Sequence, residues 1–526
     1  MSVLSERDFE TLERRGIPRE EAERQLALLA SPPKPLRLLR PATKGDGVRV
    51  LPEEVHAELL ELWAEAARAG RFTKLVPASG AASRMFAFLE ALAAEDPDPE
   101  VLAARAATGD AKAVQGLAFL EGLRRFAFRD ELAAAVDLEG TPRIAPIARA
   151  TLFTPGLGLA ALPKGLIKFH GSGPGAKTPF EEHLAEGAQS AAAKGGIVRA
   201  HFTVSAQHLR LFQELLSRVA NALSREHGVA FDVTFSEQDP STDTLAGDGA
   251  GGPFRTSGGD LLFRPGGHGA LLSNLARLEP DIVFIKNIDN VVPAGRRAPT
   301  LLWKKLLAGL ALRLEAARDR HLAALSAAPK DAALTIAADV PPEVAEAAVA
   351  AAARFVVDEL GLPEPPRDAG AIYDLLDRPL RVCGVVRNVG EPGGGPFFVD
   401  GPGGASLQIV ESAEADLSDP GQRAIWNSGT HFNPVDLVCA VRNARGELYD
   451  LKRFVNEDAV FLSHKTYEGR PLVALERPGL WNGAMARWIT VFVEVPLETF
   501  APVKTVLDLL RDEHQVSGNQ PGKTKR

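Results

Sequence analysis

Small residues next to an arginine mark the first place where this sequence could do chemistry. Residues 77–84 read Pro-Ala-Ser-Gly-Ala-Ala-Ser-Arg and follow a short apolar run that begins at Phe72. Small residues let backbone N–H groups approach an anion, and a helix N-terminus favours negative charge. Arg84 is a candidate partner for phosphate oxygens, although a tight strand-to-helix turn without a ligand explains the same pattern. The candidate anion-binding residues of this loop are Ala78, Ser79, Gly80 and Ala81.

A lysine and an aspartate farther along the chain could serve the same anion. Lys164 stands between Pro163 and Gly165, where a rigid and then a permissive backbone can hold an ammonium group near a phosphate. Asp289 leaves the apolar run 281–288, and Mg²⁺ commonly uses one or two carboxylates together with phosphate oxygens and waters. An exposed surface lysine and a strand-end cap are the alternatives. Lys286 lies inside that run, so its charge must emerge at an edge or reach a partner.

A glycine-rich segment, residues 264–270, surrounds a single histidine. It reads Arg-Pro-Gly-Gly-His-Gly-Ala and precedes an apolar helical pattern. Gly266 and Gly267 would let a base or a ribose lie against the backbone. His268 has no serine or cysteine nucleophile beside it in the sequence, so a structural hydrogen-bonding role is the competing interpretation.

Strands and helices alternate around these segments. Such alternation predicts an α/β fold with a mixed, mainly parallel sheet flanked by helices, in which ligands bind at the carboxyl ends of strands. Strands are expected from residue 72 and over 162–169, 198–204, 230–235 and 281–288, and helices over 206–223 and 269–278.

The organisation along the chain follows from changes in composition. The glycine-rich stretch 390–404 is expected to be a loop. We expect an N-terminal helical segment over 1–70, a core over 71–300 with a helical insertion at about 87–155, a helical insertion over 301–380, the remainder of the core with the acceptor side over 381–515, and a disordered tail over 516–526.

Bulk composition excludes several classes of protein. The 526 residues carry a formal net charge of −8, which argues against a general binder of nucleic acids or membrane surfaces. The two cysteines, Cys383 and Cys439, cannot form a disulfide framework, and no run approaches the roughly 20 apolar residues of a membrane span. We therefore expect a cytoplasmic protein without a membrane anchor.

Taken in order, these segments resemble the UDP-sugar pyrophosphorylase branch of the nucleotidyltransferase superfamily, and a bacterial subgroup of it. Residues 77–85 are similar to the superfamily's small-residue loop that ends in Arg-Met, and 163–165 to the segment with its triphosphate-binding lysine. Residues 234–238, Thr-Phe-Ser-Glu-Gln, are similar to the family's Phe-Asn-Gln segment, where the glutamine meets the base.

The later segments extend the resemblance. Residues 264–270 are similar to the family's Pro-Pro-Gly-His-Gly segment, and 284–290 to its Ser-Asn-Ile-Asp-Asn strand end. Residues 500–510, Phe-Ala-Pro-Val-Lys-Thr-Val-Leu-Asp-Leu-Leu, resemble its Pro-Val-Lys-Thr segment, and 475–484 occupy the place of its Leu-Glu-Thr-Ala segment. Lys504 matches a phosphate-contacting lysine of the family.

The resemblance implies a Rossmann-like nucleotidyltransferase fold of the GT-A-like type and a Mg²⁺-dependent nucleotidylyltransferase. Its substrates would be a nucleoside triphosphate, with UTP favoured, and a sugar 1-phosphate. Asp289 would hold Mg²⁺, Arg84 and Lys164 would neutralise the triphosphate, and Lys504 would reach the acceptor phosphate. The base or ribose would meet Gln238, Gly266, Gly267 and His268.

Departures from the family leave the acceptor open. Many residues separate Arg84 from Lys164, which implies a helical insertion, and residues 300–425 have no obvious counterpart. The family's C-terminal β-helix is not seen after Leu510, so its oligomeric state is not carried over. The alternatives are a nucleotidylyltransferase for a non-sugar phosphorylated or phosphonate acceptor, an inactive nucleotide-binding protein of the same fold, and a helical interaction protein.

Overall fold

The computed structural model describes residues 4–80, 82–138, 143–327, 342–363, 368–390, 393–401 and 404–516. The chain divides into two compact units, and each is built from three separate stretches. The first unit consists of Met1–Leu75, Ser236–Ile285 and Lys305–Val495. The second consists of Val76–Phe235, Lys286–Lys304 and Pro496–Arg526.

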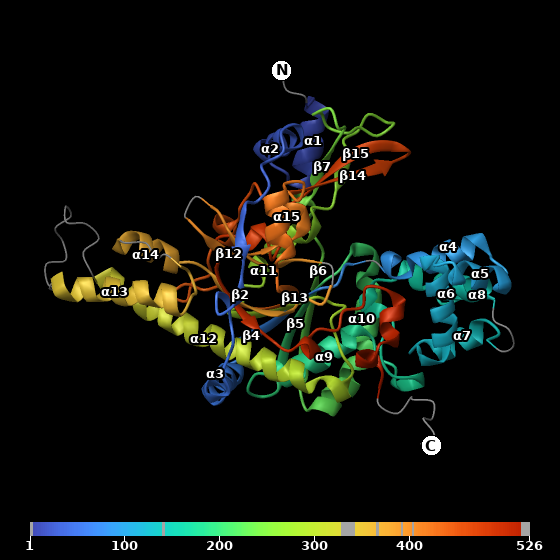
Figure 1. The fold of residues 1–526 in the computed structure, drawn as a ribbon, viewed down its shortest axis with the longest axis horizontal. Coiled ribbons are helices and arrows are strands. Elements are labelled where there is room, and N and C mark those ends of the chain that lie inside the picture. Colours follow the sequence, from blue (N-terminus) through green and yellow to red (C-terminus); the bar gives the residue numbers. More distant parts are fainter. Residues whose placement is uncertain are drawn as a thin grey trace. The chain divides into compact units, whose positions relative to one another are not determined.

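The largest sheet of the described residues has nine strands (Figure 1). Strands β2 and β3, β3 and β16, β16 and β10, and β4 and β9 pair in parallel, whereas β13 runs antiparallel to β10. The mixed, mainly parallel α/β fold predicted from the sequence is therefore confirmed. The strand order is β2 (Thr43–Lys44), β3 (Gly47–Arg49), β16 (Ile489–Glu494), β10 (Leu380–Arg387), β13 (His431–Ala440), β9 (Ile282–Lys286), β4 (Phe72–Pro77), β5 (Ile197–Thr203) and β6 (Ala230–Ser236).

Strand β9 shows why this chain forms such a sheet. Its sequence, Ile-Val-Phe-Ile-Lys, is buried along its whole length, as expected for a strand covered on both faces. Phe72 of β4 lies beside Ile282 of β9, and the register continues to Leu75 beside Ile285. The strand predicted over 281–288 is thus shorter in the structure, where it begins at Ile282 and ends at Lys286.

The first unit adds two smaller sheets. A three-stranded sheet has the order β1 (Leu38–Pro41), β11 (Gly395–Val399) and β12 (Ser406–Val410), and a four-stranded sheet has the order β14 (Phe461–Tyr467), β15 (Arg470–Glu476), β7 (Thr244–Gly247) and β8 (Phe263–Arg264). The helices of this unit include α1 (Glu6–Arg15), α2 (Arg19–Ala30), α3 (His56–Arg68), α11 (Leu271–Arg277), α13 (Pro342–Asp358), α14 (Ala369–Leu376) and α15 (Pro420–Asn427). The long helix α12 (Ala298–Ala327) begins in the second unit and continues in the first.

The second unit contains a group of short helices, which Figure 1 shows packed together. They are α4 (Ala87–Glu95), α5 (Pro99–Ala107), α6 (Ala111–Gly122), α7 (Arg129–Ala135) and α8 (Ile144–Leu152). Their apolar core also includes Val291, Val503 and Val506, which come from the segments that carry Asp289 and Lys504. A second core, under α9 (Pro179–Ser190) and α10 (Ala206–His227), joins Phe180, Phe202 and Phe212.

Three local expectations were wrong. Residues 1–70 contain the strands β1 to β3 besides helices, because those strands are too short to show a period in the sequence. The run 162–169 forms a 3₁₀ turn at Lys164–Leu166 instead of a strand, since Pro163 donates no ladder hydrogen bond. The expected loop 390–404 contains the fully buried strand β11.

Other element predictions are confirmed. Strands over 198–204 and 230–235 correspond to β5 and β6, and the helix over 206–223 corresponds to the longer α10. A 3₁₀ turn, Gly267–Ala270, leads into α11 where the helix over 269–278 was expected. Residues 517–526 of the expected tail lie outside the described residues.

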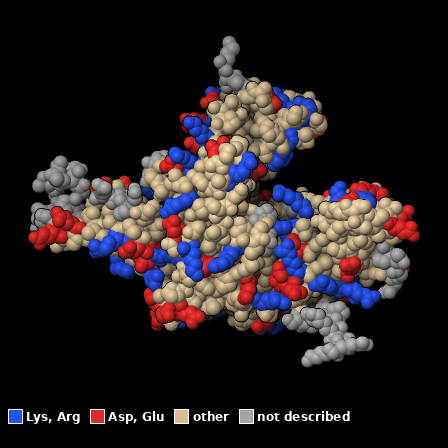
Figure 2. All heavy atoms as spheres, viewed as in Figure 1, with Lys and Arg blue, Asp and Glu red and all other residues tan. Residues whose placement is uncertain are grey.

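The helices and the surface charge were also subjects of prediction from the sequence. No helix of the described residues has the length and apolarity needed to cross a membrane. On the face shown in Figure 2, acidic and basic side chains are interspersed.

Candidate functional site

Three of the predicted site residues meet within the second unit. Lys164 Nζ lies 2.7 Å from Asp289 Oδ2, and Lys504 Nζ lies 3.5 Å from the same oxygen. Lys164 Nζ also donates to the carbonyl oxygen of Val503 at 2.6 Å. Two cations and one carboxylate, brought from three distant parts of the sequence, therefore form one cluster, which we call the lysine–aspartate cluster.

Asp289 is the buried centre of this cluster. Its side chain is 9% exposed, and that of Lys504 is 45% exposed. Burial opposes the charge of Asp289, yet the nearby ammonium groups of Lys504 and Lys164 hold the pKa of its carboxyl below the usual value. Asp289 is thus an anion at neutral pH, and its Oδ1 has no hydrogen-bond partner among the described residues.

The small-residue loop lies directly beside Lys164. The backbone N–H of Lys164 donates to the carbonyl of Gly80 at 3.3 Å, and that of Ala82 donates to the carbonyl of Leu162 at 3.3 Å. Ala78 is buried, whereas Ser79 and Gly80 are exposed. The chain thus returns to its starting point after the helices α4 to α8, which explains how a loop and a lysine so far apart in sequence become neighbours.

Backbone contacts hold the segment that carries Lys504 against the Asp289 segment. The N–H of Val503 donates to the carbonyl of Asp289 at 3.1 Å, and the N–H of Ala501 donates to Asn290 Oδ1 at 3.0 Å. Asp508 caps the turn that follows, because its Oδ2 accepts from the N–H groups of Lys504 (2.8 Å) and Thr505 (2.7 Å). The late Pro-Val-Lys-Thr segment is therefore ordered around its lysine.

Arg84 is not part of the lysine–aspartate cluster. It lies in the 3₁₀ turn Ser83–Phe86, is exposed, and makes no hydrogen bond or ion pair with the described residues. Met85 and Phe86, which follow it, are fully buried and fix the turn. Ala81 lies outside the described residues.

The residues expected to meet a base belong to the first unit. Gln238 is partly buried, and its Nε2 has no hydrogen-bond partner among the described residues. Nearby, Asn274 of α11 donates to Ser236 Oγ at 2.7 Å and to the carbonyl of Glu237 at 2.9 Å, which fixes the turn before Gln238. Gln238 thus keeps a donor that the surrounding protein does not use.

The glycine-rich segment is packed against residues of its own unit. A Cβ atom on Gly269 would lie 2.1 Å from the carbonyl oxygen of Pro478, and one on Gly266 would lie 2.5 Å from the carbonyl oxygen of Thr242. Gly267 has a positive φ of 71°, which also favours glycine. Internal packing therefore accounts for these glycines without a bound base.

His268 is held by the same neighbouring segment. Its Nδ1 accepts from the N–H of Leu480 at 3.0 Å, and its ring stacks on Trp481 with centroids 4.2 Å apart. Burial lowers the pKa of His268 to about 4. The ring is therefore neutral at physiological pH, and its structural hydrogen bond agrees with the competing interpretation given above.

Sequence reasoning missed the polar face of helix α9. His183 donates from Nε2 toward the carbonyls of Asn287 (3.1 Å) and Ile288 (3.3 Å), the two residues before Asp289. Glu186 Oε2 pairs with Lys286 Nζ at 2.8 Å, so the lysine inside the apolar run does reach a partner. The signal was present in Phe-Glu-Glu-His-Leu-Ala-Glu, but charges on a helix usually indicate a solvated face.

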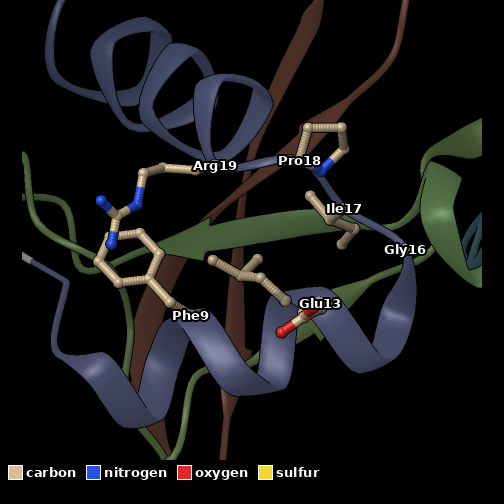
Figure 3. Close-up of a pocket in the computed structure, with 7 residues that line it drawn as sticks. Phe9, Glu13, Gly16, Ile17, Pro18 and Arg19 are labelled. Carbon is tan, nitrogen blue, oxygen red and sulfur yellow. The ribbon is translucent and has the colours of Figure 1, made fainter.

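A hollow elsewhere in the first unit has a volume of about 370 Å³. It lies between α1 and α2, where Phe9, Ile17 and Arg19 line it (Figure 3). The guanidinium of Arg19 stacks over the Phe9 ring at 3.5 Å from its centroid. None of the predicted site residues lines this hollow.

The chain is thus an α/β protein in which a buried carboxylate follows strand β9. This carboxylate lies between two lysines, and the small-residue loop lies beside one of them. The chain belongs to the family described as a domain of unknown function (DUF4301), whose model matches residues 5–515. No curated protein sequence matches it.

Several solved structures are similar at low identity. UDP-N-acetylglucosamine pyrophosphorylase from Trypanosoma brucei is 13% identical with a TM-score of 0.46, over 94% of this chain and 74% of that one. A mutant UDP-glucose pyrophosphorylase from Leishmania major is 12% identical with a TM-score of 0.46, over 97% and 79% of the two chains. At these values the likeness identifies no substrate for this protein.

Proposed function

We propose that this protein is a Mg²⁺-dependent nucleotidylyltransferase that joins a nucleoside triphosphate, with UTP favoured, to a sugar 1-phosphate and releases pyrophosphate. The observation that carries the proposal is the lysine–aspartate cluster. Its members come from three motifs that resemble the pyrophosphorylase motifs in order. The small-residue loop, from a fourth such motif, lies beside Lys164.

The charges of the cluster suit a phosphorylated ligand. Lys164, Lys504 and the Asp289 carboxylate together carry one net positive charge, so a polyphosphate would gain attraction from both ammonium groups. Lys504 is the more exposed of the two lysines and can turn toward a ligand, whereas Lys164 is fixed by two hydrogen bonds. The backbone N–H groups of Ser79 and Gly80 donate to none of the described residues, and they would add donors beside Lys164.

In the proposed reaction, an oxygen of the acceptor phosphate attacks the α-phosphorus of the triphosphate. A new oxygen–phosphorus bond forms while the bond to the β-phosphate bridging oxygen breaks, and pyrophosphate leaves with that electron pair. Such chemistry needs positioning and charge neutralisation more than proton transfer. Lys164 and Lys504 would supply fixed positive charge where negative charge grows.

Asp289 fits the demands of Mg²⁺. Mg²⁺ binds through one or two carboxylates plus substrate phosphates and waters. Asp289 is ionised, and its Oδ1 is not used by any described residue. Among the described residues no group of three or more His, Cys, Asp or Glu side chains could hold a metal alone, so the ion would arrive with the nucleotide. When bound, it would neutralise phosphate charge and polarise the α-phosphate.

The test is pyrophosphate release by the purified protein with Mg²⁺, each of the four ribonucleoside triphosphates and a panel of sugar 1-phosphates. Asp289→Asn keeps the shape of the side chain and removes its charge. The matched control is Asp110→Asn, because Asp110 caps α6 and touches no part of the cluster.

Release that requires both substrates, and that is lost in Asp289→Asn but kept in Asp110→Asn, would support the proposal and name the substrates. If a triphosphate binds but no sugar phosphate reacts, a non-sugar acceptor becomes the better proposal. If no triphosphate binds under any condition, the proposed function is wrong.

The base-binding role of Gln238, Gly266, Gly267 and His268 remains a prediction. Gln238→Ala tests it most directly, because its unused Nε2 is the donor that a pyrimidine oxygen would require. The expected result is weaker binding of UTP with unchanged binding of pyrophosphate. Equal losses for both ligands would argue that Gln238 does not read the base.

A further inference from the structure

A line of four buried side chains crosses the second unit beside the lysine–aspartate cluster. Arg297 pairs with Glu182, whose Oε1 lies 2.9 Å from His170 Nδ1. His170 Nε2 lies 3.0 Å from His514 Nδ1, and the two rings stack with centroids 5.3 Å apart. None of the four residues is more than 4% exposed.

The carboxylate of Glu182 sets the direction of its own hydrogen bond with His170. A carboxylate paired with a guanidinium can only accept, so His170 donates from Nδ1. His170 Nε2 and His514 Nδ1 share one hydrogen atom, and this bond joins the two rings. Burial is the main cause that lowers the pKa of His514 to about 3, so the ring of His514 is neutral at physiological pH.

The two ends of this line belong to the segments that form the cluster. Arg297 follows Asp289 in the stretch Lys286–Lys304, and His514 follows Lys504 in the last stretch of the unit. Lys504 reaches Asp289 only at 3.5 Å and is half exposed, so its place depends on how its segment is held. The contacts of Ala501 and Val503 lie before Lys504 in the chain, and the hydrogen bond of His514 to His170 lies after it.

We propose that His514 is a positioning residue, which through its hydrogen bond to His170 holds the Lys504 segment against Asp289. The part played by Lys504 toward phosphate rests on the proposed function, whereas the positioning of its segment does not. His514 needs no contact with the ligand for this role. Its other ring nitrogen, the buried Nε2, makes no hydrogen bond with the described residues.

Two variants separate the hydrogen bond from the packing of the ring. His514→Phe keeps a stacked ring and loses the nitrogen that hydrogen-bonds to His170, while His514→Asn places an amide group, which can donate or accept, near the position of Nδ1. The matched control is His201→Phe, which removes another buried histidine of this unit, one that lies 2.7 Å from Thr234 Oγ1.

The first measurement is amide hydrogen exchange of Ala501 and Val503 in the ligand-free protein. We expect exchange about five- to tenfold faster in His514→Phe, as for the loss of one buried hydrogen bond, and near wild-type exchange in His514→Asn and His201→Phe. Unchanged exchange in His514→Phe, or equal acceleration in His514→Phe and His514→Asn, would overturn the proposal.

The second measurement is a double-mutant cycle on the binding of inorganic pyrophosphate with Mg²⁺. If His514 acts through Lys504, His514→Phe weakens binding in the wild-type background and adds nothing in the Lys504→Ala background. Independent, multiplying effects would show that His514 does not act through Lys504. Wild-type protein that binds no pyrophosphate would count against the proposed function alone, and hydrogen exchange would then decide the positioning role.

Discussion

Asp289 and Glu414 are equally buried residues, each 6% exposed when backbone and side chain are taken together, yet their environments shift their pKa values in opposite directions. Burial opposes ionisation of Asp289, but Lys504 and Lys164 outweigh it and lower its pKa. Burial raises the pKa of Glu414 to about 8, since the hydrogen bonds that its Oε2 accepts from the Asn482 amide and the Glu411 N–H offset burial only in part.

The comparison shows that burial alone does not mark a functional carboxylate. Glu414 is protonated at neutral pH and links the segments of Glu411 and Asn482 in the first unit, whereas Asp289 is kept as an anion by cations that a ligand or a metal could share. Catalysis on phosphates requires charged side chains that stay ionised in a buried site.

The largest expected effect is on activity. Asp289→Asn should lower nucleotidyl transfer by at least about a hundredfold, because it removes a fixed charge from the reacting centre. Glu414→Gln should leave the rate close to that of the wild type, since the glutamine replaces a side chain that is already neutral. Steady-state kinetics of both variants, with circular dichroism to confirm folding, test the contrast. Equal losses of activity would remove the distinction between the two carboxylates.

The second expected effect concerns stability against pH. Folded Glu414 keeps its proton to about pH 8, while the unfolded chain releases it near the usual value of 4.5. The folded state therefore loses stability as the pH rises through this window, by about 5 kcal/mol in total. Urea unfolding at pH 5, 7 and 9 should show this loss in the wild type.

Glu414→Gln should flatten that profile and make the variant more stable than the wild type at pH 9. Glu61→Gln, at an exposed position of α3, is the matched control and should follow the wild type. Asp289 has the opposite sign, because its lowered pKa contributes stability that is lost as the pH falls. A Glu414→Gln profile as steep as that of the wild type would contradict the raised pKa.

A third, smaller effect tests whether the glycine-rich segment serves packing. Gly269→Ala should lower the free energy of unfolding by about 1–3 kcal/mol, because its Cβ would overlap the carbonyl of Pro478. Gly295→Ala is the control, since nothing lies within 4 Å of a Cβ there. Denaturant unfolding measures both, and equal stabilities would show that the close approach is not a constraint.

The smallest stability effect is expected at Arg84. Arg84→Ala should change the free energy of unfolding by less than about 0.5 kcal/mol, because the side chain is exposed and unpaired among the described residues. If Arg84 binds phosphate oxygens as the resemblance implies, triphosphate binding should weaken about tenfold. Arg124→Ala, another exposed arginine, is the control in calorimetric titrations. Unchanged binding would remove Arg84 from the candidate site.

The sequence predicted the α/β fold because strand-like runs such as those of β5 and β9 alternate along the chain with helical patterns such as that of α10. It also placed Lys164, Asp289 and Lys504 in one list of candidates, which the structure brings together. Lys164 follows a proline and Asp289 follows a strand end, and such local patterns are visible without knowledge of distant contacts, whereas Lys504 was identified only through the family resemblance.

Features that depend on distant partners were missed. Glu182, His183 and Glu186 resemble the solvated face of a helix until their partners, at least 100 residues away, are known. The strands β1 to β3 are short and gain their order from pairing with later strands. The glycines around His268 resembled a ligand-binding loop, although carbonyl groups of their own unit occupy the space beside them.

The two hydrogen bonds that join the small-residue loop to residues 162–164 have a consequence for the helices α4 to α8. The stretch that carries these helices begins and ends at neighbouring points, so its length can change at little cost in loop-closure entropy. Insertions or deletions within these helices could therefore accumulate during evolution without moving Lys164 away from Gly80.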